Sequence, residues 1–334
     1  MSGSVMQTSL TNPLISVVIP VYNASDYLLS SIQSILNQSY NNLEILIADD
    51  ASTDESWTKI QSLKDDRLKV FRNSINKGYL ETCNFLFEQC TGDLITFQDA
   101  DDISDLQRIE IQVNEFIRNQ KLGICGTSVY RIDTEGRIIY EEKKTEKDNE
   151  IKARIAQSPQ FCGATIMITK SVLKEVGGYR TYFNRIGSED YDWSYRIVEN
   201  NYSHNIDQPL YYYRQHSSAL SKEIDVRKMI SAKMVQYFGR QRREFGMDDL
   251  DNGAFEMIKQ KESELTAPYI ADRSLIYVEY ASWFMYNRMY RSAIDAATKA
   301  VRSNIFSFRN IRTLAYCLRI TLLNYVRTGR KDRI

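Results

Sequence analysis

The chain has 334 residues, and its 43 lysines and arginines equal its 43 aspartates and glutamates, so its formal net charge is zero. This balance argues against a protein that coats a polyanion, because such binding needs a large positive excess, and we expect no nucleic-acid partner. Hydrophobic residues make up 43% of the chain and there are only two histidines, which predicts a folded core and little imidazole chemistry. The length suggests about two domains.

The cysteines and the apolar segments bear on the cellular compartment. The five cysteines include no C-x-x-C pair, which predicts reduced, mostly buried thiols and no disulfide framework or zinc site. Residues 1–13 lack the apolar segment of a secretory signal, and we expect them to be disordered. The longest apolar candidate, residues 314–326, is interrupted by Arg319 and Asn324 and falls short of the ~18 residues that span a bilayer. We therefore expect a cytoplasmic protein.

Residues 14–100 alternate between strand and helix signals. Short apolar runs predict strands at 14–21, 43–48, 68–71 and 94–97. Helical spacing predicts a helix through Leu36 that is capped by Ser25 or Asp26, and further helices at 54–63 and 79–90. This alternation predicts an α/β sheet with crossover helices. Ligands of such sheets bind beyond the carboxyl ends of the strands, which directs attention to residues 20–23, 49–54 and 98–102.

Residues 101–220 lose the regular alternation. Segments 123–131 and 137–140 flank a turn at 133–136 and predict a hairpin. The charged stretch 141–150 predicts an exposed loop, and 161–169 predicts another strand. A short helix at 171–176 is expected to end at Gly177 and Gly178.

After about residue 222 the pattern is helical. Segments 277–290, 292–301 and 308–318 resemble a tetratricopeptide-like helical hairpin with one more helix. Residues 301–334 carry eight basic residues and one acid, a net charge of +7. One interpretation is a solvated helix surface. The other is peripheral contact with anionic lipid headgroups at the inner face of the cell membrane.

Two groups of acids directly follow predicted strands: Asp49 with Asp50, and Asp99 with Asp101 and Asp102. Acids this close repel one another unless a positive charge lies among them. Mg²⁺ and Mn²⁺ prefer such oxygen ligands, often one or two carboxylates together with phosphate oxygens. The alternative is that acids cap the following helices, as Asp54 and Asp105 can, but capping does not explain why two acids follow one strand.

Six segments, in order, resemble those of family 2 glycosyltransferases with the GT-A fold, and they lie within residues 14–220. The segments are VVIPVYNASDYLLSSIQSILNQSY, LIADDASTDES, NKGYLETCN, FQDADDISDLQRIEIQ, GSEDYDWSYRI and PLYYYRQHSSALS. Each segment alone is weak, but six in the family order are a strong match. The resemblance implies a GT-A domain at residues 14–221, with a Rossmann-like mixed sheet, followed by a helical region at 222–334.

The resemblance also implies roles for individual residues. Nucleotide-sugar binding is implied for Pro20, Tyr22, Asn23, Asp49, Asp50, Asn76, Asp99 and Ser221. Divalent metal binding is implied for Asp99 and Asp101 of the D-x-D motif and for His216. Gly163 corresponds to a glycine of the acceptor-side loop. Asp190 corresponds to the general base of the x-E-D motif, beside Glu189.

The residues support these roles independently. A departing diphosphate needs its charge neutralised, and a carboxylate can take the acceptor's proton. Asp190 opens a helix that is predicted to run to Glu199, so capping is the alternative for Glu189 and Asp190. His216 is as readily a structural residue.

Other polar and aromatic side chains near these motifs have two interpretations each. Arg214 could meet phosphate. An acceptor-sugar platform is possible for Tyr191, Trp193, Tyr211 and Tyr212, although core packing is the stronger expectation for most of them.

We therefore expect an inverting, metal-dependent glycosyltransferase that uses a nucleotide sugar, with a UDP-sugar favoured. Its acceptor would be a glycan or lipid-linked saccharide of a surface polysaccharide. A sugar-phosphate nucleotidyltransferase is an alternative, but it would need a glycine- and arginine-rich phosphate loop where this chain has PVYNASDY. A non-catalytic interaction protein that uses its helical tail is another, but it would not need Asp99, Asp101 and Asp190 together.

Overall fold

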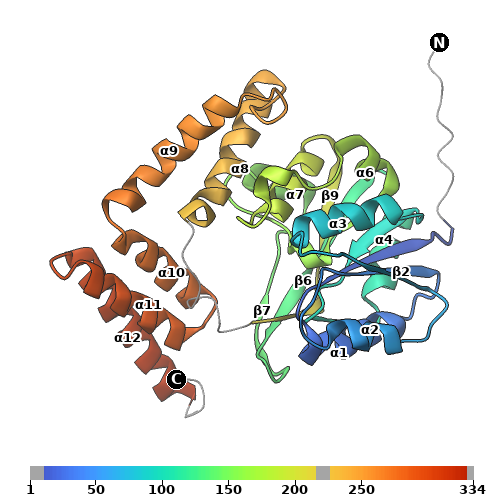
Figure 1. The fold of residues 1–334 in the computed structure, drawn as a ribbon, viewed down its shortest axis with the longest axis horizontal. Helices are drawn as coiled ribbons and strands as arrows, with labels where there is room; N and C mark the ends of the chain where they lie inside the picture. The colour runs from blue at the N-terminus through green and yellow to red at the C-terminus, as the bar shows by residue number, and fades with distance from the viewer. Residues whose placement is uncertain (1–10, 216–225, 329–334) are drawn as a thin grey trace. The chain divides into compact units, whose positions relative to one another are not determined.

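The computed structural model describes residues 11–215 and 226–328 of the chain. The chain divides into two compact units, Met1–Gln215 and His216–Ile334. Figure 1 shows a mixed sheet with surrounding helices in the first unit and only helices in the second.

The first half of the first unit is a parallel sheet. Its strands are β1 (Ile15–Val21), β2 (Leu43–Asp49), β3 (Leu68–Arg72) and β4 (Leu94–Phe97). They lie in the order β3-β2-β1-β4 and all pair in parallel. All four predicted strands are thus confirmed. Every residue of β1, β2 and β4 is buried, as expected for strands covered on both faces.

The register brings the carboxyl ends of these strands to one edge of the sheet. Val21 lies opposite Asp49, which in turn lies opposite Arg72. Val18 lies opposite Phe97, so β4 ends beside the last residues of β1. The segments that follow β1, β2 and β4 therefore leave the sheet at the same edge, where ligands bind in such folds.

Helices cover both faces of this half-sheet. The helices are α1 (Ser25–Leu36), α2 (Ser56–Ser62), α3 (Tyr79–Gln89) and α4 (Arg108–Arg118). The chain moves outward from β1 to β3 and then returns to β4, so right-handed crossovers place α1 and α2 on one face and α3 on the other, as Figure 1 shows. The main core packs α1 and α4 against β1 and β2.

The cap predicted for α1 is wrong. Its N-cap residue is Ala24, which makes no side-chain cap bond. Instead, the backbone N–H of Ser25 donates to Asp54 Oδ2 (3.0 Å) and that of Ala24 donates to Ser56 Oγ (2.9 Å). The first backbone N–H groups of the helix, which have no partner within it, therefore donate to side chains of the segment after β2. A capping rule based on neighbouring residues does not include such distant acceptors.

The second half of the sheet is mixed. Its strands are β5 (Ile103–Ser104), β6 (Leu122–Ile132), β7 (Ile138–Glu142), β8 (Met167–Thr169) and β9 (Tyr202–Arg214). They complete a nine-stranded sheet in the described part of the chain. The long β6 pairs antiparallel with β7 and β8 and parallel with β9. The predicted hairpin is confirmed, and its turn closes with a hydrogen bond from Gly136 N to Asp133 O.

Two element predictions in this half are wrong. The stretch 141–150 is not a loop throughout, because Glu141 and Glu142 end β7 and α5 (Asp148–Arg154) begins within it. The predicted strand 161–169 is a strand only at its end. Its middle is a 3-10 turn, η1 (Gly163–Thr165), before β8. The carbonyls of this turn are hydrogen-bonded by side chains from other elements, as described below.

The first unit also contains α6 (Lys170–Val176), η2 (Thr181–Phe183) and α7 (Glu189–Asn200). The short helix α6 ends at Gly177, whose φ of 77° suits a glycine. On the face that α3 covers, an aromatic cluster joins Phe87, Phe97, Tyr179 and Trp193, with ring centroids between 5.1 and 6.2 Å apart.

The second unit contains α8 (Val226–Phe245), α9 (Phe255–Ala271), α10 (Ser274–Tyr286), α11 (Tyr290–Ser303) and α12 (Phe308–Thr328). A small core joins the last three helices, and α11 contributes a stripe of buried alanines that lets its neighbours approach closely. The predicted helical pattern of this region is confirmed. None of the described helices is both long enough and apolar enough to cross a bilayer. All five cysteines are buried and none is in a disulfide.

Candidate functional site

The turn after β1 is fixed by contacts with the turn after β2. Pro20 is buried within β1, whereas Tyr22 is 50% exposed. Asn23 has a left-handed backbone (φ 49°). Its backbone N–H donates to Ser52 Oγ (3.0 Å), and its Oδ1 accepts from the backbone N–H of Thr53 (2.8 Å). Tyr22 is therefore presented to solvent on a rigid turn, and Asn23 holds that turn in place.

The two acids that end β2 have different environments. Asp50 accepts hydrogen bonds from Asn73 Nδ2 (2.7 Å) and from the backbone N–H groups of Lys77 (2.9 Å) and Gly78 (2.8 Å). Asp49 is fully buried and pairs with Arg72 through Oδ2 (3.2 Å), while its Oδ1 has no partner. Asp50 thus holds the loop before α3, and Asp49 keeps one buried carboxylate oxygen without a partner.

Asn76 lies in the loop that Asp50 holds. Its backbone carbonyl and Oδ1 both accept from Arg185 Nη2, at 2.8 and 2.9 Å. The loop before α3 is thereby tied to the segment that precedes α7. Neither of these two contacts involves the side-chain amide nitrogen of Asn76.

The D-x-D segment leaves the sheet at the end of β4. Asp99 Oδ1 accepts from the Tyr79 hydroxyl (3.3 Å), and the Asp99 backbone N–H donates to the Tyr211 hydroxyl (3.1 Å). Burial and the charge of Asp101 raise the pKa of Asp99 to about 7. Burial and the charges of Asp99 and Asp101 raise the pKa of Asp102 well above its usual range. Three acids in four residues therefore share one strained electrostatic environment, which a cation would relieve.

Arg214, at the end of β9, fastens this segment. Its backbone N–H donates to Asp102 Oδ1 (2.6 Å), and its Nε donates to the Asp101 carbonyl (2.8 Å). Its Nη1 donates to the carbonyls of Asp133 (3.0 Å) and Thr134 (3.1 Å). Arg214 is 5% exposed, and both its Nε and its Nη1 donate to backbone carbonyls.

Glu189 and Asp190 form the first turn of α7. Asp190 Oδ1 accepts from the backbone N–H of Tyr191 (2.8 Å), so the capping interpretation also applies to this residue. Burial and the charge of Asp190 raise the pKa of Glu189 to about 7. Burial also raises the pKa of Asp190, against the opposing effects of the Tyr191 N–H and the Lys144 charge.

The two acidic groups influence each other across the site. After burial and Asp101, the charge of Asp190 is a further cause that raises the pKa of Asp99. The charge of Asp99 in turn contributes to the raised pKa of Glu189. The structure therefore brings the D-x-D acids and the acids of α7, about 90 residues apart in the chain, into one electrostatic environment.

Gly163 allows Asp190 to lie against the backbone of η1. A Cβ atom at position 163 would lie 2.6 Å from Asp190 Oδ2 and 2.9 Å from Asp190 Cβ. Contacts that short do not occur between real atoms, so glycine is required at this position for the observed place of the carboxylate.

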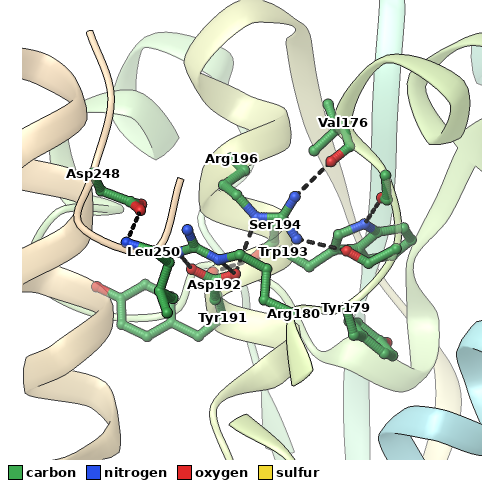
Figure 2. A network of polar contacts seen from close by, with 12 residues as sticks. Val176, Tyr179, Arg180, Tyr191, Asp192, Trp193, Ser194, Arg196, Asp248 and Leu250 are labelled. Atoms are coloured by element: carbon green, nitrogen blue, oxygen red, sulfur yellow. Dashed lines mark hydrogen bonds and ion pairs between the residues drawn. The ribbon is translucent and has the colours of Figure 1, made fainter. Parts of the chain in front are cut away.

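A buried ion cluster anchors α7 (Figure 2). Asp192 is fully buried and pairs with both Arg180 and Arg196. Arg196 also donates to the carbonyls of Val176 (2.6 Å) and Gly178 (2.7 Å). The Trp193 indole N–H donates to the Gly177 carbonyl (2.8 Å). These bonds tie the first turns of α7 to the end of α6 and so fix the place of Asp190.

The aromatic residues near α7 belong to the core. Tyr191, Trp193 and Tyr211 are 2%, 0% and 0% exposed, and they therefore offer no platform to an acceptor sugar. Tyr212 is half-buried on β9, and its ring lies 5.4 Å from that of Tyr130 at an angle of 31°. The expectation of core packing is confirmed for the first three residues.

Asp99 and Asp101 fit a hard divalent cation in their chemistry. Both side chains are partly exposed and offer carboxylate oxygens, the donors that Mg²⁺ and Mn²⁺ prefer. Within residues 11–215 and 226–328, no group of three or more histidines, cysteines and acids is gathered as a complete protein cage. Mg²⁺ sites commonly use one or two carboxylates and complete their shell with waters and substrate phosphates. His216 and Ser221 lie outside the described residues.

The sequence pattern did not indicate Lys144. Glu142 pairs with Lys144 Nζ and with Arg131 Nε, each at 2.6 Å, and all three side chains are at most 15% exposed. Every residue from Glu141 to Lys144 is charged, so the sequence here lacks the polar–apolar alternation that marks a half-buried strand. Only the structure shows that Glu142 and Lys144 are turned inward.

The first unit is an α/β domain with several acids at the carboxyl edge of its sheet and a further acidic pair at the start of α7, a place where the ligands of such folds bind. The comparisons with known proteins identify its family. The model of "Glycosyl transferase family 2" matches residues 16–177. EpsE of Bacillus subtilis (strain 168), provisionally named a glycosyltransferase, is 31% identical over 220 residues, which cover 64% of this chain and 77% of EpsE. The chain belongs to glycosyltransferase family 2.

A second relative has a more specific name. The Escherichia coli protein WfaP, named UDP-Glc:alpha-D-GlcNAc-diphosphoundecaprenol beta-1,3-glucosyltransferase, is 28% identical over 217 residues, covering 62% of this chain and 80% of WfaP.

Solved structures support the fold. S. aureus TarS 1-349, crystallised with UDP-GlcNAc, has a TM-score of 0.57 at 16% identity, over 96% of this chain and 93% of that one. The mannosyltransferase PcManGT from Pyrobaculum calidifontis, in complex with GDP-Man and Mn²⁺, has a TM-score of 0.52 at 16% identity, over 93% and 81% of the two chains. The GT-A fold predicted from the sequence is confirmed, with helices following it.

Proposed function

We propose that this glycosyltransferase transfers a sugar from a UDP-sugar to a hydroxyl of a lipid-linked saccharide, with inversion at the anomeric carbon and with a divalent metal ion. The observation that carries the proposal is that a chain of this family holds the D-x-D acids at the end of β4 and Asp190 against the η1 turn of the same unit, where the charges of Asp99 and Asp190 are close enough to influence each other. The acids at the end of β4 would then act at the leaving group, and Asp190 would act at the acceptor hydroxyl.

Asp190 is the proposed general base. It removes the proton of the acceptor hydroxyl as that oxygen bonds to the anomeric carbon, and the bond from this carbon to the diphosphate breaks. The nucleoside diphosphate leaves with the bonding electrons. The Tyr191 N–H and the Lys144 charge favour the ionised form of Asp190, which the reaction requires. In this pair we assign Glu189 a structural role in the first turn of α7.

Asp99 and Asp101 are the proposed metal ligands, and His216 is a further candidate. At such a site Mg²⁺ or Mn²⁺ supplies neutralisation of the charge on a leaving diphosphate. The complex of PcManGT with GDP-Man and Mn²⁺ supports this assignment. Arg214 fixes the backbone of the D-x-D segment, so its carboxylates need little reorganisation when a ligand binds.

The nucleotide is proposed to bind along the edge that β1 and β2 form. Tyr22 supplies an exposed ring for a base. Asp49, whose buried Oδ1 has no partner, is the proposed acceptor for a base N–H or a ribose hydroxyl once the nucleotide has entered. Pro20, Asn23, Asp50 and Asn76 shape the turns around that place, and Ser221 is proposed to contact the pyrophosphate. The UDP-Glc in the name of WfaP and the UDP-GlcNAc complex of TarS support a UDP-sugar.

A panel of nucleotide sugars tests the proposal. The protein is incubated with each donor and Mn²⁺, and donor hydrolysis and protection against heat are measured. We expect one UDP-sugar to be hydrolysed slowly and to raise the melting temperature. Transfer is then measured with lipid diphosphate-linked saccharides, and D101N and D190N should each abolish it.

D207N is the matched control, because Asp207 is an exposed acid on β9 that pairs only at the surface with Lys143. It should transfer at the wild-type rate. Full activity of D101N and D190N would refute the assigned mechanism.

We also propose that the second unit makes peripheral contact with the inner face of the cell membrane. The solvent side of α12 is largely apolar, with exposed Phe308, Ile311, Tyr316, Leu318, Leu322, Leu323 and Val326. Arg312 and Arg319 are exposed among them, and residues 301–331 contain no acid. An apolar helix face with arginines suits the interface of an anionic bilayer, where a lipid-linked acceptor would be found.

A further inference from the structure

Arg108, in the first turn of α4, is a buried cation that the proposed reaction has not yet used. It is 0% exposed. Its guanidinium lies 5.3 Å from the centre of the Tyr211 ring and feels the charge of Asp99, but it forms no ion pair with any described residue. Burial lowers its pKa to about 10, which leaves the guanidinium charged at neutral pH. Burying a charge without an ion pair is costly, and a methionine would fill similar space without that cost. Packing alone therefore does not account for an arginine here.

The guanidinium of Arg108 reaches two segments of the candidate site. Its Nη2 donates to the carbonyl of Phe97 (2.8 Å), two residues before Asp99. Its Nη1 lies 3.4 Å from the carbonyl of Ala164, which directly follows the glycine that contacts Asp190. One planar group thus joins the end of β4 to the η1 turn.

The next two carbonyls of the same segment are held in the same way. Gln112, one turn further along α4 and 0% exposed, donates from Nε2 to the carbonyl of Thr165 (2.8 Å). Thr96 Oγ1, on β4, donates to the carbonyl of Ile166 (2.9 Å). Three consecutive carbonyls, 164 to 166, therefore accept from buried side chains of α4 and β4.

We propose that Arg108 and Gln112 are positioning residues that hold the η1 turn at a fixed distance from the end of β4, so that the D-x-D acids and the base keep their spacing. The inference rests on the proposed function for its catalytic consequence. Its geometric part does not depend on the reaction: the turn against which Asp190 lies is held by side chains and not by a β-ladder. Because a misplacement of about 1 Å can cost about 100-fold in rate, weakening this hold should reduce transfer.

The test compares R108M, Q112L and T96V with the control R118M. Arg118 lies on the same helix, and its side chain is 73% exposed. The first measurement is backbone hydrogen exchange of residues 162–166 without substrate. We expect exchange about tenfold faster than in wild type in the three variants and unchanged in R118M. T96V replaces only a hydroxyl by a methyl group, so the exchange measurement can be made on this variant if R108M does not fold.

The second measurement is the ratio of transfer to donor hydrolysis without acceptor. Q112L and T96V should lower transfer at least tenfold more than hydrolysis, because both release carbonyls of the η1 turn and leave the bond from Arg108 to the Phe97 carbonyl in place. T96V also removes a weak contact from Arg108 Nη1 to Thr96 Oγ1 (3.4 Å). R108M should lower both transfer and hydrolysis. R108K should restore neither activity fully, because the lysine ammonium cannot donate to two separate carbonyls from one planar group as the guanidinium does.

Wild-type exchange at 162–166 in a folded Q112L and a folded T96V would overturn the inference whatever the donor proves to be. Equal losses of transfer and hydrolysis in these two variants would overturn its catalytic part. Failure of every nucleotide sugar with the wild-type protein would refute the proposed function instead, and the exchange result would stand.

Discussion

At the scale of single residues, the contact between Gly163 and Asp190 gives the sharpest prediction. In G163A the new Cβ would meet Asp190 Oδ2 at 2.6 Å, so the carboxylate must move away from its present place. We expect transfer to fall about 100-fold, while UDP still protects against heat, because the acids at the end of β4 are untouched. Steady-state kinetics and thermal shift with UDP and Mn²⁺ measure the two effects.

G92A is the matched control for this prediction. A Cβ at position 92 would lie 2.7 Å from the Leu14 carbonyl and the Ser16 nitrogen, which is an equal crowding at the amino end of β1. This variant should lose stability but keep its transfer rate per folded molecule. Equal rates in G163A and wild type would show that Asp190 need not lie against the η1 backbone.

The Glu189 carboxyl predicts a pH-dependent stability. Burial and the charge of Asp190 raise its pKa from 4.5 to about 7 in the folded protein. Its contribution to stability is therefore fully present below pH 4.5 and is lost as the pH rises through 7. Glutamine does not ionise, so the melting temperature of E189Q should exceed that of wild type at pH 8 by about 2–4 °C, an effect on the order of 1 kcal/mol.

The same comparison at pH 4.5 is the internal control. There both proteins carry a neutral side chain at position 189, and their melting temperatures should agree. A constant difference across pH 4.5–8 would mean that Glu189 ionises with an ordinary pKa.

Sequence alone could name the acids of the site but not separate their roles. Asp49 and Asp50 are adjacent aspartates that the sequence cannot distinguish. The tertiary contacts show that Asp50 accepts hydrogen bonds from the loop before α3, whereas Asp49 keeps one buried oxygen without a partner. Sequence alone could not place Arg214 for the same reason. A guanidinium suits phosphate and backbone carbonyls alike, and its partners are up to 113 residues away.

At the scale of elements, α7 is held by the buried cluster shown in Figure 2. Asp192 pairs with Arg180 and Arg196. D192N would leave two buried guanidinium groups without their counter-charge, which typically costs about 3–5 kcal/mol. We expect a melting temperature lower by about 10 °C and a loss of transfer in the fraction that stays folded, because the first turn of α7 carries Asp190. Calorimetry and kinetics measure the two effects.

D207N controls for the loss of a negative charge. Its pair with Lys143 is exposed, with side-chain exposures of 55% and 63%, and such pairs contribute about 0–1 kcal/mol. A melting temperature of D192N equal to that of D207N would mean that the Arg180–Asp192–Arg196 cluster does not anchor the helix.

The elements that sequence predicted well are those in which local pattern and burial agree. The runs of β1, β2 and β4 are apolar and fully buried, so their composition sufficed. Prediction failed at 161–169, where apolar residues resemble a strand. There the carbonyls of residues 164–166 bond to side chains of α4 and β4. It also failed at 141–150, where charged residues are half-buried in pairs.

At the scale of the whole molecule, we predict that metal removal abolishes the activity but leaves the fold intact. The described core is apolar and the sheet is complete without a metal-bound crosslink. EDTA should therefore abolish transfer with little change in the melting temperature of the free protein, and Mn²⁺ or Mg²⁺ should restore transfer. UDP at 100 times its Kd should stabilise by about 2.7 kcal/mol, and only with metal present. Transfer that persists after exhaustive chelation would refute metal dependence.

The exposed face of α12 predicts how the whole protein associates with membranes. In the triple variant L322S/L323S/V326S three exposed apolar side chains become polar, and in R312Q/R319Q two exposed cations become neutral. Both sets should reduce pelleting with vesicles that contain phosphatidylglycerol by about tenfold, because interfacial binding sums apolar burial and electrostatic attraction. M257S/I270S, which changes exposed apolar residues of α9, should bind like wild type. Phosphatidylcholine vesicles should bind the protein weakly throughout, since they lack the anionic headgroups that attract the arginines. Pelleting of both α12 variants at the wild-type level would refute membrane contact through this helix, and a loss of self-association in light scattering would identify the face as an interface between copies of the chain.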